Sequence, residues 1–272
     1  MRIIVKVAAF AAVLAMLGCG GGGNGNPPTT GGLTKQSVVA LLGQGMKNSE
    51  SIRNGNGEGG EPPVRSRVDG EFYFEETLNL WVQDVFPSDT DPAGTPRGSL
   101  YYEDEAKTKP AGHNLFTLPQ PGVWPEVYRE ETEYLAGTLA GYREVMEWRA
   151  NEDGSGSSTG EGSAAGHGSW EFTGSWGPDR LSHFTQRFEG VDGSWQEYDY
   201  QEMAEGASRV VMTSSQGVTF TLNFSGDFSG NGTITGTAEG LPATITWDIN
   251  GDGAIAWADG TTTAINIYDL GA

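Results

Sequence analysis

The segment VTFTLNF, residues 218–224, is the clearest guide to how this chain folds. Polar and apolar side chains alternate in it from Thr219 to Phe224, as in a strand with one face on a core and the other in water. Other short segments rich in Thr, Val and Ile surround it, with glycine-containing turns between them. These candidate strands are residues 210–213, 218–224, 233–237, 243–249, 254–258 and 262–268. Short strands with no helical pattern between them predict an antiparallel β-meander.

The same alternation of strands and turns continues toward the N-terminus. We predict further strands at residues 68–74, 78–86 and 100–102, where aromatic and β-branched residues gather. Stretches in which Gly, Pro, Ser and Asp dominate predict loops. These loops are residues 54–63, 87–96, 110–125 and 151–168.

Residues 126–150 fit two structures. Tyr128, Leu135 and Leu139 have helical spacing, whereas Tyr142, Glu144, Met146 and Trp148 would share one side of a strand. A glycine inside a helix costs about 1 kcal/mol relative to alanine. The two Ala-Gly pairs at 136–137 and 140–141 suit a hairpin bend instead, so we favour two strands.

Composition places these elements in one domain. The 272 residues include 42 glycines and 13 prolines, which favour many turns over long helices. Residues 34–47 form the segment with helical spacing, and Thr34 can serve as its N-cap. We therefore predict a single all-β domain over residues 33–272, an antiparallel meander with one short N-terminal helix. The meander can form a curled sheet, a sandwich or an open barrel.

The N-terminus carries an export signal. Two positive charges precede an apolar run from Val7 to Leu17, and Gly18 stands before Cys19, the single cysteine of the chain. The order Met16-Leu17-Gly18-Cys19 resembles the lipobox of bacterial lipoproteins, although that family most often has Leu where Met16 stands. The resemblance implies cleavage before Cys19, a diacylglycerol on its thiol and acylation of the new amine.

A plain signal peptide and a transmembrane anchor are the alternatives. The apolar run is shorter than the roughly 20 residues that cross about 30 Å of hydrocarbon, and a soluble exported protein needs no cysteine at the junction. We predict a lipoprotein signal peptide at residues 1–18 and a lipidated Gly/Pro-rich tether at residues 19–32, which reaches on the order of 20 Å. Because Gly20 rather than Asp follows Cys19, the resemblance implies the outer membrane or the cell surface of a bacterial envelope.

The charge of the chain limits its partners. Its formal net charge is −20, with 36 acidic and 16 basic residues. Such a chain repels phosphate backbones, so we expect no nucleic acid partner. It also repels anionic headgroups, so the lipid rather than a basic patch must hold it to the membrane. With Cys19 lipidated, the chain has no cysteine left for a disulfide. The sequence does not indicate an oligomeric state.

One segment resembles a calcium loop. The residues DINGDGAIAWAD, Asp248 to Asp259, place oxygen-bearing side chains at the spacing found in EF-hands and in dockerin repeats. Those loops continue into a helix, whereas here an alternating segment precedes the loop and a turn follows it. Asn250-Gly251 is also a hairpin signal. We predict a hairpin, with calcium as the alternative, and no other cofactor.

Tryptophans supply the candidate binding residues. Trp170, Trp176 and Trp195 each end a Gly-Ser-Trp triplet, and exposed aromatic rings can stack on the apolar faces of sugars. The alternative is that these rings belong to the core, since aromatic residues dominate the cores of β proteins. The three triplets are too few to indicate a solenoid or propeller.

The sequence contains no assembled catalytic motif. Acidic pairs such as Glu130-Glu131 fit solvated faces in a chain so rich in acids, and His113, His167 and His183 lack the spacing of a zinc site. We assign no catalytic residue and no metal ligand. The sequence favours a lipid-anchored envelope protein with a non-catalytic structural or ligand-binding role. A carbohydrate-binding protein is the sharper version, and a polysaccharide hydrolase with an unidentified carboxylate pair is the alternative.

Overall fold

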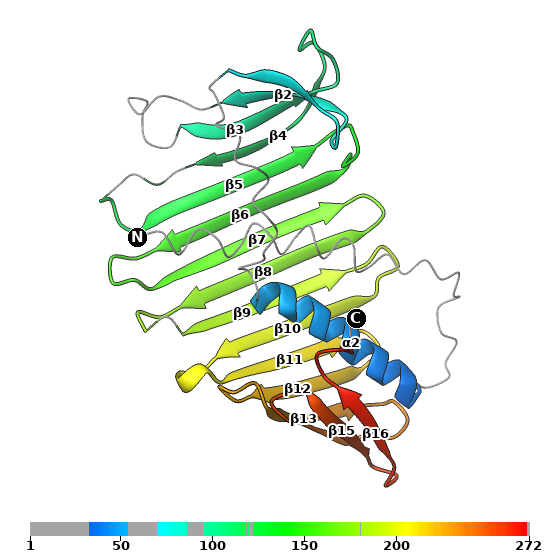
Figure 1. The fold of residues 1–272 in the computed structure, drawn as a ribbon. Helices are drawn as coiled ribbons and strands as arrows, with labels where there is room; N and C mark the ends of the chain where they lie inside the picture. Colours follow the sequence, from blue (N-terminus) through cyan, green and yellow to red (C-terminus); the bar gives the residue numbers. More distant parts are fainter. Residues whose placement is uncertain are drawn as a thin grey trace. The chain divides into compact units, whose positions relative to one another are not determined.

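The computed structural model describes residues 33–53, 70–85, 95–117, 119, 122–179 and 181–270. Its strands form antiparallel meanders and are accompanied by one short helix near the N-terminus, which confirms the predicted fold class (Figure 1). The chain divides into two compact units, residues 58–180 and residues 1–57 with 181–272. The predicted signal peptide, Cys19 and the tether lie outside the described residues. No helix among the described residues is long and apolar enough to cross a membrane.

The unit of residues 58–180, here the β1–β8 unit, is a meander in which each strand pairs with the next in the chain. Its strands are β1 (Phe72–Glu75), β2 (Leu80–Val85), β3 (Pro96–Tyr102), β4 (Pro110–Thr117), β5 (Glu126–Tyr134), β6 (Tyr142–Ala150), β7 (Gly156–Ala164) and β8 (Gly168–Trp176). Strands β5 and β6 confirm that residues 126–150 form a hairpin rather than a helix.

Two predicted loops of this unit are strands, and the prediction was wrong there. Residues 110–125 include β4 and residues 151–168 include β7. In β7, Gly160 and Gly162 lie opposite Phe172 and Trp170 of β8, and a side chain at either glycine would collide with the facing ring. The aromatic rings of β8 therefore occupy the space over the glycines, which lets a Gly/Ser-rich segment pair as a strand.

The second unit, here the β9–β16 unit, combines a meander with the helix. Its elements are α2 (Lys35–Arg53), β9 (Ser182–Glu189), β10 (Trp195–Glu202), β11 (Ser208–Ser214), β12 (Val218–Phe224), β13 (Gly230–Gly236), β14 (Ala243–Trp247), β15 (Asp252–Trp257) and β16 (Thr262–Asn266), with a short 3₁₀ turn at Ala204–Gly206. Each of its strands pairs with the next one in the chain, antiparallel throughout.

The core of the β9–β16 unit lies between α2 and one face of its sheet (Figure 1). The segment that guides the fold behaves as predicted, since the side chains of Val218, Phe220, Leu222 and Phe224 are all buried in this core. The helix contributes Val38 and Leu42 to it, four residues apart on one helical face. The opposite face of this sheet is called the outer face below.

The start of α2 also follows the prediction. The hydroxyl of Thr34 accepts a hydrogen bond from the N–H of Ser37 at 3.2 Å, as an N-cap residue does. Two glycines inside the helix have a packing reason: a side chain at Gly43 would collide with the backbone of Leu270, and one at Gly45 would meet the sulfur of Met212. The helix thus lies close to the sheet because these positions have no side chain.

Candidate functional site

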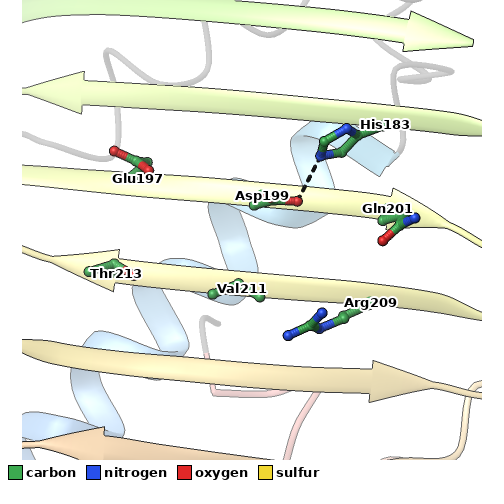
Figure 2. Close-up of a pocket in the computed structure, with 7 residues that line it drawn as sticks. All are labelled: His183, Glu197, Asp199, Gln201, Arg209, Val211 and Thr213. Atoms are coloured by element: carbon green, nitrogen blue, oxygen red, sulfur yellow. Dashed lines mark hydrogen bonds and ion pairs between the residues drawn. The ribbon is translucent and has the colours of Figure 1, made fainter.

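A shallow hollow lies on the outer face of the β9–β16 unit, over strands β9, β10 and β11 (Figure 2). Its volume is about 300 Å³, and α2 lies behind the sheet on the other side. Strand alternation explains its composition: Tyr198, Val210 and Met212 face the core, and their chain neighbours face outward. The lining residues are His183, Glu197, Asp199, Gln201, Arg209, Val211 and Thr213.

A hydrogen bond crosses the hollow. The Nε2 atom of His183 lies 3.0 Å from a carboxylate oxygen of Asp199, and both side chains are half exposed. The two residues are diagonal neighbours, because His183 pairs in register with Gln201 and Asp199 pairs with Thr185. Both side chains line the hollow, where an imidazole and a carboxylate can hydrogen-bond a ligand.

Arg187 and its acidic partners lie beside the hollow and contact a tryptophan ring. The guanidinium of Arg187 lies 3.5 Å from Glu197 and 3.8 Å from Glu189. The same guanidinium lies 4.6 Å from the centre of the Trp195 ring, a cation–π geometry. Trp195 and Glu197 occupy alternate positions of β10, so both project to the outer face. The predicted binding residue Trp195 is therefore next to the hollow.

The chemistry of the hollow favours binding. It offers two carboxylates, an amide, a hydroxyl, an imidazole and a guanidinium on one surface. Carboxylates accept hydrogen bonds, Arg209 donates them, and Gln201 and Thr213 do both. Such mixed donors and acceptors suit a polar ligand that carries many hydroxyl groups and little charge.

The structure places the other two candidate tryptophans in the β1–β8 unit. Trp170 is 6% exposed, packs against Tyr142 at a ring-centre distance of 5.6 Å, and donates a hydrogen bond from Nε1 to Glu144 at 3.3 Å. Trp176 lies against Gly156, and its Nε1 atom is buried without a hydrogen-bond partner. Trp170 and Trp176 thus contribute to strand packing, and Trp195 is the candidate that borders the hollow.

The segment from Asp248 to Asp259 includes the β14–β15 hairpin turn, as predicted. Asp248 begins the turn between β14 and β15, where its carboxylate accepts hydrogen bonds from the N–H groups of Asn250 at 2.8 Å and Asp252 at 3.1 Å. Asp259 lies beyond the far end of β15, in the turn to β16. Its ion pair with Lys35, together with hydrogen bonds from Thr261, lowers the pKa of Asp259. The described residues contain no group of three or more His, Cys, Asp or Glu side chains arranged to hold a metal.

Sequence reasoning missed a buried carboxyl in the β1–β8 unit. Glu144 of β6 is 6% exposed and accepts hydrogen bonds from the Tyr142 hydroxyl at 2.7 Å and from Trp170. Burial raises the pKa of Glu144 to about 7, and Glu130 nearby adds to the rise. The signal was present in the sequence, since Glu144 stands between Tyr142 and Met146 on the apolar side of its strand.

Glu130 also departs from its predicted role on a solvated face. Its carboxylate accepts a hydrogen bond from Asn114 of the adjacent strand β4 at 3.0 Å. Burial raises the pKa of Glu130, against the effect of that hydrogen bond. Glu130 and Glu144 project from the same face of neighbouring strands, because Thr132, two residues from Glu130, pairs with Glu144.

Comparison with known proteins adds no functional assignment to this geometry. No protein-family model matches the chain, and no curated protein sequence matches it.

Proposed function

We propose that this protein is a lipid-anchored, non-catalytic protein of the bacterial cell envelope, and that the hollow on its outer face binds carbohydrate. The observation that carries the proposal is the placement of Trp195 beside a hollow with mixed donors and acceptors. A sugar combines apolar ring faces, which stack on aromatic side chains, with hydroxyls that need both donors and acceptors.

The acids of the hollow already have hydrogen-bond or ion-pair partners, which supports the binding of a neutral ligand. Asp199 is hydrogen-bonded to His183, and Glu197 forms an ion pair with Arg187, so both acids already have a partner on this surface. A neutral sugar can exchange hydrogen bonds with such pairs without leaving an isolated charge behind. An anionic ligand would meet a chain of net charge −20 and is disfavoured.

The N-terminal sequence supports the location. The lipobox-like tetrapeptide that ends at Cys19 precedes a tether of Gly, Asn, Pro and Thr residues. Several acyl chains at Cys19 would anchor the protein lastingly. We place it in the envelope, at the outer membrane or the cell surface, because Gly20 follows Cys19.

A glycan array tests the binding proposal with a soluble form of residues 33–272. We expect binding to at least one envelope or plant glycan, and a loss of binding of tenfold or more for Trp195→Ala and for Asp199→Asn. Thr246→Ala is the matched control, because Thr246 is exposed on the outer face at β14, away from the hollow. Absence of binding to every glycan, or equal binding by all variants, would refute the proposal.

A polysaccharide hydrolase is the second candidate function, favoured by the raised pKa of Glu144. A glycoside hydrolase needs a carboxyl that stays protonated near neutral pH as general acid, and a second carboxylate nearby. Glu144 has a pKa of about 7, and Glu130 projects from the same sheet face. Polysaccharide turnover that Glu144→Gln abolishes would establish this candidate in place of the first.

A further inference from the structure

Four hairpin turns of this protein share one construction. In each, an aspartate carboxylate accepts hydrogen bonds from the N–H and the hydroxyl of the residue two positions later: Asp153 with Ser155, Asp192 with Ser194, Asp227 with Ser229 and Asp259 with Thr261. The residue between the two partners has a positive φ in all four turns. Three turns have glycine there, with φ of 86°, 77° and 83° at Gly154, Gly193 and Gly260.

The fourth turn has phenylalanine at this position. Phe228 has a φ of 69°, a left-handed conformation that is unfavourable for a bulky side chain and easy for glycine. The side chain is also 45% exposed, so burial does not account for its presence. A strained residue persists where the surrounding structure enforces it, and such residues concentrate at functional sites. Among these four turns, Phe228 is the exception to glycine.

Two more exposed apolar side chains belong to the same end of the sheet. Tyr268, after β16, donates a hydrogen bond from its hydroxyl to the backbone carbonyl of Phe228 at 2.7 Å. The N–H of Ile267 bonds the carbonyl of Gly251 at 2.8 Å, which ties this segment to the β14–β15 turn. Ile249 in that turn is 61% exposed, and Tyr268 is 39% exposed. Phe228, Ile249 and Tyr268, here the apolar tip, are thus carried by segments that hydrogen bonds hold together.

The rim of the apolar tip is acidic. The exposed aspartates of these segments are Asp227, Asp248, Asp252 and Asp269. No lysine or arginine occurs in residues 225–229, 248–252 or 266–270. An exposed apolar patch with a polar rim is typical of an interaction surface. The acidic rim favours a partner with a basic surface, because opposite charge around an apolar contact steers association and excludes like-charged surfaces.

We propose that the apolar tip is a docking surface for a protein partner whose apolar pocket is surrounded by lysine or arginine side chains. An anionic membrane would be repelled by the rim. The start of the described chain also lies at the other edge of this sheet: Leu33 accepts a hydrogen bond from Glu239 in the β13–β14 turn, and Lys35 is paired with Asp259 in the β15–β16 turn. In a meander these turns lie at the opposite strand ends from the turns after β12 and β14, so the start of the described chain lies away from the tip.

Photo-crosslinking of the full-length chain in cells tests the proposal. A photoreactive residue replaces Ile249 at the tip or, as a matched control, Val191, which is 72% exposed in the β9–β10 turn at the opposite edge. We expect a protein adduct of discrete mass from position 249 and none from position 191. The adduct should disappear in Phe228→Gly, and raising the salt concentration should weaken it, because the rim contributes electrostatic attraction.

The thermal stability of Phe228→Gly separates docking from packing. Since three equivalent turns carry glycine, this variant should have a Tm equal to or above that of the wild type. A lower Tm would mean that Phe228 serves the fold and would overturn the proposal. The proposal would also be overturned if position 249 gave no adduct, or an adduct to lipid alone. It would be overturned as well if position 191 gave an equal adduct, or if Phe228→Gly left the adduct from position 249 unchanged.

Discussion

Glu144 is a buried carboxyl on the apolar face of strand β6. Its neighbours on the same strand face are Tyr142 and Met146, both buried. Charge on Glu144 is therefore poorly solvated, and the acid is stabilised in its neutral form. The two hydrogen bonds that it accepts, from Tyr142 and Trp170, favour the charged form but do not offset burial. The titratable groups that face it from β5 are Glu130 and Tyr134, and neither carries a positive charge.

This environment predicts that stability falls as pH rises. The pKa of Glu144 is about 7 in the folded protein, against 4.5 as its ordinary value. Below pH 4.5 the carboxyl is protonated in both states and its contribution is fully present; it is lost as pH rises through 7, because only the unfolded state releases the proton easily. The loss is about 3 kcal/mol, at 1.36 kcal/mol for each unit of pKa difference. Urea unfolding at pH 5 and pH 8 measures most of this loss, because pH 5 already lies above the ordinary pKa of 4.5.

Glu144→Gln is the control for that measurement, because it keeps the acceptor oxygen for Tyr142 and removes the titration. We expect the difference in unfolding free energy between pH 5 and pH 8 to shrink in this variant. The pKa of Glu130 is also raised, so some loss of unfolding free energy between pH 5 and pH 8 should remain in this variant. An equal pH dependence in wild type and Glu144→Gln would show that Glu144 does not titrate in this range.

At the level of elements, strand β7 stands out because its inward positions hold small residues. Gly160 and Gly162 face the rings of Phe172 and Trp170 across the β7–β8 pair. A glycine in a strand leaves space for a close approach by a neighbouring group, and here an aromatic ring fills that space. The two strands therefore share one packing layer, in which the aromatic rings of β8 fill the space left by the glycines of β7.

A larger side chain at a β7 glycine should destabilise the sheet. Gly162→Val would place a branched side chain against the Trp170 ring, and overpacking of this kind costs about 1–3 kcal/mol. Ser163→Ala is the matched control, since the neighbouring Ser163 is exposed and its change should stay within about 0.5 kcal/mol. Chemical unfolding of both variants measures the costs, and equal values for the two would contradict this account of β7.

The errors and successes of the sequence prediction follow from the same physics. The segment 218–224 could be predicted because each buried residue carries its own apolar side chain. The segment 156–164 could not, because the apolar groups that cover it belong to β8 and become neighbours only through pairing. Pro110 and Gly112 similarly suggested a loop where β4 forms. Composition predicts a strand that carries its own buried apolar side chains. It does not predict a strand whose apolar cover comes from the side chains of the neighbouring strand.

For the molecule as a whole, the candidate site depends on pairing that no local pattern reveals. His183 and Asp199 are separated by 16 positions in the sequence and meet across the β9–β10 hairpin. Trp195 was identified from its triplet, but the hollow beside it required the outward alternation of three strands in register. The sequence thus predicted the all-β class and one residue near the site, whereas the register of the strands assembled the rest.

The last prediction concerns how the whole molecule is held in the envelope. If Cys19 carries the lipid, as its resemblance to a lipobox implies, cells that express the full chain should incorporate palmitate into the wild type and not into Cys19→Ser. The chain has no other cysteine, so the substitution removes the site of thioether attachment completely. Without acyl chains, we expect the variant to be repelled by anionic lipid, because acids outnumber bases by 36 to 16.

Fractionation gives the second measurement of the same prediction. We expect the wild type with the membranes, and Cys19→Ser either uncleaved at its leader or released from the membranes once the leader is removed. Starting the chain at residue 33 behind an ordinary cleavable export signal removes both the apolar run and Cys19, and we expect this variant to lose its association with the membranes. Equal palmitate labelling of wild type and Cys19→Ser, or a wild type found wholly in the soluble fraction, would exclude the anchor. The carbohydrate proposal would survive that outcome, because the hollow is built from residues of β9–β11 alone.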